Sequence, residues 1–171
     1  MVFCLLLAVA AGACSSSPPG ADGNYRNPDR GFAVSFPMLW ELRENLLGLD
    51  VAGLMPADGP EDLFRENVTV ASSPMPSPLS AEAILDGNIP AMIKAIPNFQ
   101  PGERGRADLS GTPAAWLRYT QTQDEFKLTV VLYAVAGKKH AYLIHCTSET
   151  AAWESFRQRC EEVVNSFKVI E

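Results

Sequence analysis

The sequence predicts an α+β fold, in which an antiparallel sheet of about six strands lies between helices. The first reason is a series of three strand-like runs at residues 112–122, 126–136 and 141–146, separated by short polar breaks that suit hairpins. The second is that the middle run is apolar at both alternating sets of positions, so this strand must be covered on both faces. The third is a pair of stretches with helical spacing, at residues 80–96 and 150–166, which can supply the two covers.

The first helical stretch begins at a good N-cap, Ser80, and places Leu79 and Ile84 where they can pack together across the first turn. Pro90 removes one backbone hydrogen bond from its interior, so a kink or a break is expected near residues 87–88. We expect the second stretch to pack back across the sheet through one apolar side, formed by Trp153, Phe156, Cys160, Val163, Val164 and Phe167.

Further strands are predicted at residues 31–37, 67–71 and 99–109. An apolar run at residues 46–55 contains two glycines, which disfavour a helix. Residues 72–78 hold three prolines and are expected to form an extended surface loop.

The chain has 171 residues, a formal net charge of −6 and an isoelectric point near 4.9. This length suits one domain with a short leader. The acidic balance argues against a nucleic-acid partner, since no basic surface is available to neutralise phosphates. For the same reason, charge alone would not hold the protein on anionic lipid.

Residues 2–13 form an uncharged apolar run, shorter than the roughly 20 residues that a membrane-spanning helix needs. The run ends in small residues directly before Cys14, and polar residues follow. This pattern resembles a bacterial lipoprotein signal peptide, which implies that Cys14 receives a lipid anchor. Because Ala11 stands where Leu is usual and no Lys or Arg precedes the run, an ordinary secretory signal cut near Ala13 is the alternative.

The predicted organisation is therefore a lipoprotein signal peptide at residues 1–13, a lipid-anchored flexible tether at 14–29 and a globular domain at 30–171. The tether is rich in Ser, Pro, Gly, Asp and Asn and shows no apolar period. Ser15 is not the acidic residue that retains some lipoproteins at the inner membrane. The periplasmic side of the outer membrane is therefore slightly favoured as the location.

Three motifs resemble the PsbP-like lipoproteins, including bacterial DcrB-type envelope proteins. They are residues 31–37 with Trp40 shortly after, residues 111–119, and Phe156 with residues 165–167. The resemblance covers most of the chain from about residue 24 and implies a PsbP-like α/β/α sandwich, an antiparallel sheet between helices. It implies no common activity, since members serve as photosystem accessory subunits, envelope lipoproteins or, in a eukaryotic relative, a GTPase-binding import factor.

His140 and His145 are the two histidines, and their odd separation on the last strand places them on opposite faces. No carboxylate or cysteine spacing completes a metal site around either, so a surface or sheet-edge role is expected for both. His145 adjoins Cys146, but neighbours along a strand point to opposite sides, which disfavours a Cys–His catalytic pair.

Cys146 and Cys160 form a possible disulfide, because export would place them in an oxidising compartment. Cys146 belongs to the last strand and Cys160 to the sheet-facing side of the second helix, at similar distances from the turn between them. A usual separation of about 10 Å between layers makes the bond marginal, so a disulfide and two buried free thiols both remain open.

Other candidates for chemistry have structural explanations. Residues 67–69 match the glycosylation pattern but are expected to begin a strand. Three tryptophans could line a ligand pocket but are expected in the core: Trp40, Trp116 and Trp153. An acidic loop could hold a cation weakly, although a solvated loop is favoured; it contains Asp58, Glu61 and Asp62. The sequence thus indicates no catalytic residue, no cofactor and no metal ligand.

We expect a non-enzymatic bacterial envelope lipoprotein, held at the membrane by the lipid on Cys14. Its PsbP-like domain would bind another envelope protein as an accessory or assembly subunit. The alternative is a periplasmic carrier of a small apolar ligand, which requires a cavity between sheet and helices. A hydrolytic enzyme comes third, because it needs polar groups that converge in a cleft.

Overall fold

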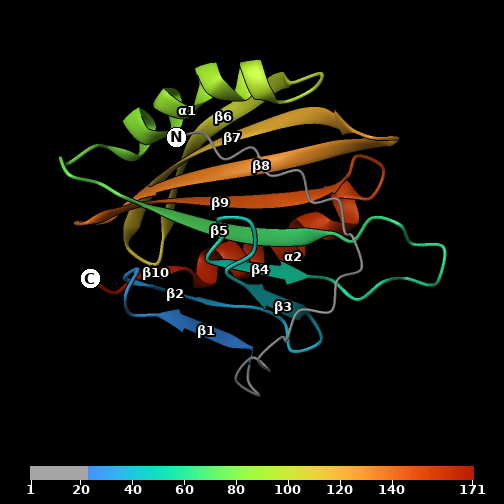
Figure 1. Cartoon of the computed structure of the whole chain (residues 1–171), viewed down its shortest axis with the longest axis horizontal. Helices are drawn as coiled ribbons and strands as arrows, with labels where there is room; N and C mark the ends of the chain where they lie inside the picture. Colours follow the sequence, from blue (N-terminus) through green and yellow to red (C-terminus); the bar gives the residue numbers. More distant parts are fainter. Residues whose placement is uncertain (1–22) are drawn as a thin grey trace.

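The computed structural model describes residues 23–171, and the strands of that range form one large and one small sheet (Figure 1). The large sheet has the strand order β3-β4-β5-β9-β8-β7-β6 and is antiparallel throughout. The small sheet has the order β1-β2-β10. The α+β fold is confirmed, with seven strands in the main sheet. In chain order the elements are β1 (Asn24–Asn27), β2 (Phe32–Ser35), β3 (Glu41–Glu44), β4 (Val51–Leu54), β5 (Asn67–Pro74), α1 (Ala81–Ala95), β6 (Gln100–Leu109), β7 (Thr112–Gln123), β8 (Phe126–Ala136), β9 (His140–Glu149), α2 (Trp153–Ser166) and β10 (Lys168–Val169).

Strands β7, β8 and β9 form the predicted meander. Asp124 and Glu125 make the turn between β7 and β8, and Asp124 takes the left-handed conformation with φ 52°. Along β8, Val131 enters the core on one face of the sheet and Val130 enters the core on the other. The expectation that this strand is covered on both faces is therefore confirmed.

Helix α1 covers only part of its face of the large sheet. Its buried side chains, including Leu85 and Met92, pack with Leu117 and Leu132 of β7 and β8. Figure 1 shows α1 along the β6–β8 side of the sheet, away from β4 and β5. The same face of β9 and β5 is consequently left without a helix above it.

The opposite face is closed by α2 together with the small sheet. Here Phe32 stacks on Phe167 with ring centroids 5.6 Å apart, and Tyr142 meets Phe32 edge-on at 5.6 Å. Trp40 stacks on Phe156 at 6.2 Å. All five aromatic side chains are buried, so this layer is a packed aromatic core.

Two local features on the α1 side differ from the sequence expectation. Of the kink or break expected near residues 87–88, the break does not occur: helix α1 runs continuously through Pro90, with buried side chains on both sides of the proline that hold it on the sheet. Strand β5 extends to Pro74, although a loop was expected from residue 72, because β9 pairs with it over this length. The end of β5 extends past its pairing with β4, so the backbone N–H groups on that edge need other partners. The Asp50 carboxylate accepts the Ser72 N–H at 2.6 Å, and Pro74 has no N–H.

The folded domain begins earlier than expected. Residues 24–27, assigned to the tether from their composition, form β1 because Tyr25 is buried and donates its hydroxyl to the Asp50 carbonyl at 3.3 Å. The predicted signal peptide at residues 1–13, the lipidation site Cys14 and the tether up to residue 22 lie outside the described residues. No helix within residues 23–171 is long and apolar enough to cross a membrane.

The Glu171 side chain fastens the end of the chain to the turn between β8 and β9. Its carboxylate accepts the backbone N–H of Lys138 at 2.5 Å and of Lys139 at 2.7 Å. It also contacts the His140 ring at 2.6 Å and the Tyr142 hydroxyl at 3.0 Å. Burial would raise the pKa of Glu171, but these hydrogen bonds outweigh it and hold the pKa below its ordinary value.

Cys146 of β9 and Cys160 of α2 are joined by a disulfide, with their Cα atoms 5.7 Å apart. The layer spacing of about 10 Å overestimates the separation here, because α2 begins only four residues after β9 ends and the two elements are still close together near this turn. Both cysteines are fully buried. Of the two alternatives left open by the sequence, the structure has the bonded one.

Replacing both cysteines by alanine should lower the free energy of unfolding by about 3 kcal/mol, the magnitude typical of a closed loop of this size. Urea unfolding of wild type and of C146A/C160A measures the difference. A reducing agent should destabilise the wild type and leave the double variant unchanged. Equal stability of the two proteins, or alkylation of both thiols in unreduced wild type, would contradict the assignment.

Candidate functional site

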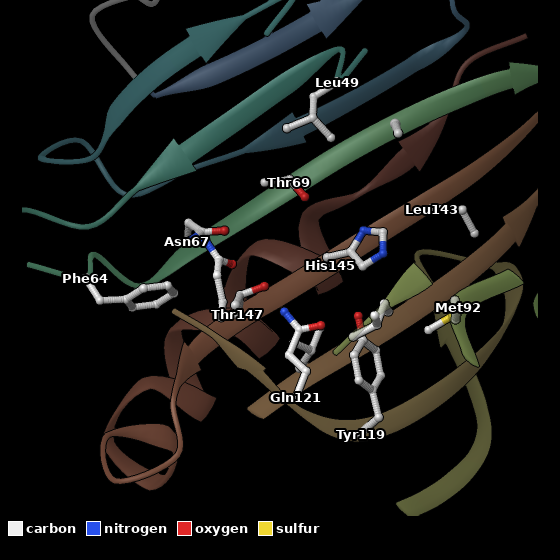
Figure 2. Close-up of a pocket in the computed structure, with 14 residues that line it drawn as sticks. Leu49, Phe64, Asn67, Thr69, Met92, Tyr119, Gln121, Leu143, His145 and Thr147 are labelled. Atoms are coloured by element: carbon white, nitrogen blue, oxygen red, sulfur yellow. The ribbon is translucent and has the colours of Figure 1, made fainter. Parts of the chain in front are cut away.

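A cavity of about 70 Å³ lies on the α1 side of the large sheet (Figure 2). Strands β5, β9, β8 and β7 form its floor. Met92 of α1 and Ile96, which directly follows the helix, lie on one side, and the loop residues Leu49 and Phe64 lie on the other. The cavity thus occupies the region of the sheet that α1 leaves uncovered.

The register of β5 and β9 places four polar side chains next to one another on the cavity floor. Thr69 is directly opposite His145, and Asn67 is directly opposite Thr147. Because residues two apart on a strand share a face, all four lie on the same face. Figure 2 shows these side chains, together with Gln121 of β7, around one common space.

Several of these polar groups have no hydrogen-bond partner among residues 23–171. The side chains of Thr69, His145, Thr147, Gln121 and Gln123 make no hydrogen bond with another residue of the range 23–171. Thr69 is 5% exposed and Gln123 is 7% exposed, and both line the cavity. Buried polar groups are normally satisfied, which makes this cluster suited to holding a hydrogen-bonding molecule.

The cavity carries no formal charge at neutral pH. None of its fourteen lining residues is Asp, Glu, Lys or Arg. Burial lowers the pKa of His145 to about 4, so its ring is neutral at pH 7. A histidine with this pKa is a weak base, and no carboxylate in the cavity orients it, so the arrangement favours binding over proton transfer.

A larger groove adjoins the cavity along α1. It has a volume of about 680 Å³ and shares the lining residues Ala71 and Leu143 with the cavity. Met75, Leu79 and Ile84 give it an apolar wall between α1 and the end of β5. The cavity, which has polar side chains on its floor, therefore continues into a groove with an apolar wall and some polar lining residues, among them Ser72, Ser73 and Asn88.

Exposed apolar side chains occur at, or next in sequence to, residues that line the cavity and the groove. Six large apolar residues of the described range are exposed, and four of them line these hollows or adjoin a lining residue: Leu47, Leu63, Leu79 and Ile93. We call these four residues the apolar rim. Leu47 has φ 51°, a left-handed conformation that costs a branched residue about 1–2 kcal/mol. Such strain is typical of functional loops.

The two histidines do lie on opposite faces of β9, as predicted, but the sheet-edge role is wrong for His145. Strand β9 lies between β5 and β8, so His145 faces the cavity from the centre of the sheet. His140 is bound to Glu171 instead. Cys146 points away from His145 into the α2 core and is held in the disulfide, so the two residues form no catalytic pair.

The remaining candidates from the sequence have structural roles. Trp40 and Trp153 are buried in the α2 core and Trp116 packs against it, as expected. Trp116 and Trp153 also line a separate hollow of about 260 Å³ beside α2. Residues 67–69 begin β5, and Asp62 accepts the backbone N–H of Asp58 at 3.0 Å within the acidic loop. No group of three or more His, Cys, Asp or Glu residues within the described range could hold a metal ion.

Sequence reasoning missed most of the cavity floor. Thr147 lies beyond the predicted end of the last strand, which continues to Glu149. Thr69 and Gln121 fall on predicted strands but carry no motif, and Gln123 was assigned to the polar break after residue 122, whereas β7 continues to Gln123. The sequence did hold one usable signal: Leu143, His145 and Thr147 lie on one face of the last strand, and two of the three are polar. A strand at the centre of a sheet rarely presents two successive polar side chains to a covered face, so this pattern could have indicated a cavity.

The free energy of unfolding should fall as the pH is lowered from about 6.5 to about 4. The unfolded chain protonates His145 near its ordinary pKa, whereas the folded protein protonates it only near pH 4, so stability is lost across this interval. H145Q should show a flatter profile in this range. Parallel profiles for the two proteins, or a His145 ring signal that titrates near pH 6.5 by NMR, would contradict this placement.

Comparison with known proteins agrees with this architecture. A family described as "PsbP-like protein" matches residues 21–169. Cyanobacterial PsbP (CyanoP) from Synechocystis sp. PCC 6803 is similar in structure, with a TM-score of 0.65, 15% identity, and coverage of 93% of this chain and 98% of that chain. LpqN, described as involved in cell envelope biogenesis of Mycobacterium tuberculosis, has a TM-score of 0.65 and 14% identity, over 82% of this chain and 83% of that chain.

The Saccharomyces cerevisiae Ran-binding protein Mog1p is a third similar structure, with a TM-score of 0.53 and 11% identity over 86% of this chain and 95% of that chain. At such identities the structures share the fold alone. No curated protein sequence matches the chain. Because the family match extends over nearly all of the described residues, the chain belongs to the PsbP-like family.

Proposed function

We propose that the protein is a non-enzymatic lipoprotein of the bacterial cell envelope, whose PsbP-like domain binds another envelope protein as an accessory or assembly subunit. The lipid on Cys14 would hold the domain at the membrane, with the periplasmic side of the outer membrane slightly favoured. The family match, the buried disulfide and the similarity to LpqN support an extracytoplasmic binding domain.

The observation that carries this proposal is the apolar rim, whose four exposed residues line the groove or adjoin lining residues of the two hollows along the chain. Leu47, Leu63, Leu79 and Ile93 are between 51% and 76% exposed. Large apolar side chains exposed beside a hollow are typical of a protein-binding site. The cavity beneath them has a neutral histidine and no carboxylate, which favours a binding role over a catalytic one.

The anchor has a direct test. Protein extracted from membranes should begin at Cys14 and carry the added mass of a diacylglyceryl group and acyl chain, and C14S should move to the soluble fraction. An unmodified Cys14 in the mature protein, or membrane retention of C14S equal to wild type, would contradict the anchor.

The partner surface is tested by cross-linking in intact cells, followed by affinity capture and mass spectrometry. L47E and I93E should each reduce capture of the main partner at least tenfold. Binding would bury the new carboxylate in an apolar interface, where it finds no opposite charge. L39E is the matched control, since Leu39 is 83% exposed, belongs to the segment between β2 and β3, and neither lines the cavity or the groove nor adjoins a residue that does.

Loss of the same partner with L39E, or full capture with both rim variants, would contradict the rim as the binding surface. C14S separates the contribution of the membrane from that of the surface. A protein that cross-links to no partner in any form would overturn the proposed function itself.

A further inference from the structure

The polar floor of the cavity is built to hold a molecule. Five polar side chains without a hydrogen-bond partner in the described range meet around this space, where each can exchange hydrogen bonds with a molecule in the cavity. About 70 Å³ is room for several water molecules or for one small polar group of a ligand. The hydroxyls of Thr69 and Thr147 and the amides of Gln121 and Gln123 both donate and accept hydrogen bonds.

Because the lining carries no charge, the cavity discriminates between charged and neutral polar groups of a ligand. A carboxylate, phosphate or ammonium group would lose its hydration in this cavity and meet no opposite charge, which is strongly unfavourable. A hydroxyl or an amide loses much less and can exchange hydrogen bonds with every polar residue of the floor. The cavity therefore favours a neutral group that donates and accepts hydrogen bonds.

The adjoining groove favours an apolar chain attached to the ligand's polar group. It continues from Ala71 and Leu143 past Ile84 of α1 to Met75 and Leu79, and Leu79 is itself 51% exposed. An alkyl chain placed there gains about 0.8 kcal/mol for each buried CH₂ group. The groove's Arg30 lies near the carboxylate of Asp50, with 3.6 Å between Arg30 Nε and Asp50 Oδ1, so it is partly neutralised.

We propose that the cavity and groove together bind a single-chain amphiphile with a neutral hydroxyl or amide head, the head against Thr69, His145 and Thr147 and the chain along α1. This ligand differs from the purely apolar one considered from the sequence, because the floor of the site is polar. Of the four apolar rim residues, Leu79 lines the groove, whereas Leu47 and Ile93, the two used to test the partner surface, line neither hollow. The ligand site does not depend on the proposed protein partner.

The test is calorimetric titration of the full chain carrying C14S, which avoids detergent, with monolauroylglycerol below its micelle concentration. Lauric acid and dodecylamine at pH 7 serve as charged probes of the same chain length. Monolauroylglycerol should bind at least tenfold more tightly than either charged probe. T69V/T147V, which keeps the side-chain shape and removes two hydroxyls, should weaken binding at least tenfold.

T120V is the matched control, because Thr120 lies on β7 with its exposed side chain on the face opposite to Gln121 and Tyr119. It should bind the probe as wild type does. T69S/T147S restores the hydroxyls, so recovered binding separates the loss of hydrogen bonds from a loss of folding. No heat of binding for any probe, which would mean that water alone fills the cavity, would overturn the proposal, as would equal binding of all three probes.

Discussion

The unequal covering of the seven-stranded sheet is the constraint on which the rest of this structure depends. The strand order places β8 and β9 at the centre, where both faces must be shielded from water. Helix α2 and the small sheet cover most of one face with a packed aromatic layer. The other face receives one helix, α1, which lies on β7 and β8. The remaining part of that face, over β9 and β5, becomes the cavity and the groove.

Two interactions tie β9, which carries part of the cavity floor, to other parts of the protein. The disulfide ties Cys146 of β9 to α2, and the Glu171 carboxylate binds the turn at the start of β9. Strand β9 alternates between the two faces, so Cys146 and Tyr142 point into the closed core while His145 and Thr147 point into the cavity. Fastening one face of the strand therefore also fixes the positions of the polar groups on the other.

Much of the fold could be predicted from the sequence, because it depends on local patterns. The doubly apolar run of β8 indicated a sheet covered on both sides, and the apolar stripes indicated its two helices. The pairing of β5 with β9 could not be predicted, since it joins segments about 75 residues apart and no local pattern records it. That pairing sets Thr69 beside His145 and creates the cavity floor. The Cys146–Cys160 bond stayed open for a related reason, as it depends on how closely α2 approaches β9.

The most direct measurement of the central claim is an NMR chemical-shift map of the isotope-labelled chain with and without monolauroylglycerol. If the half-covered face is the binding face, the largest shifts fall on Thr69, His145, Thr147 and the neighbouring residues of α1. Residues of the closed core, such as Phe32 and Phe156, should change little. Shifts concentrated around Trp116 and Trp153 beside α2, or spread evenly over both faces, would contradict this account.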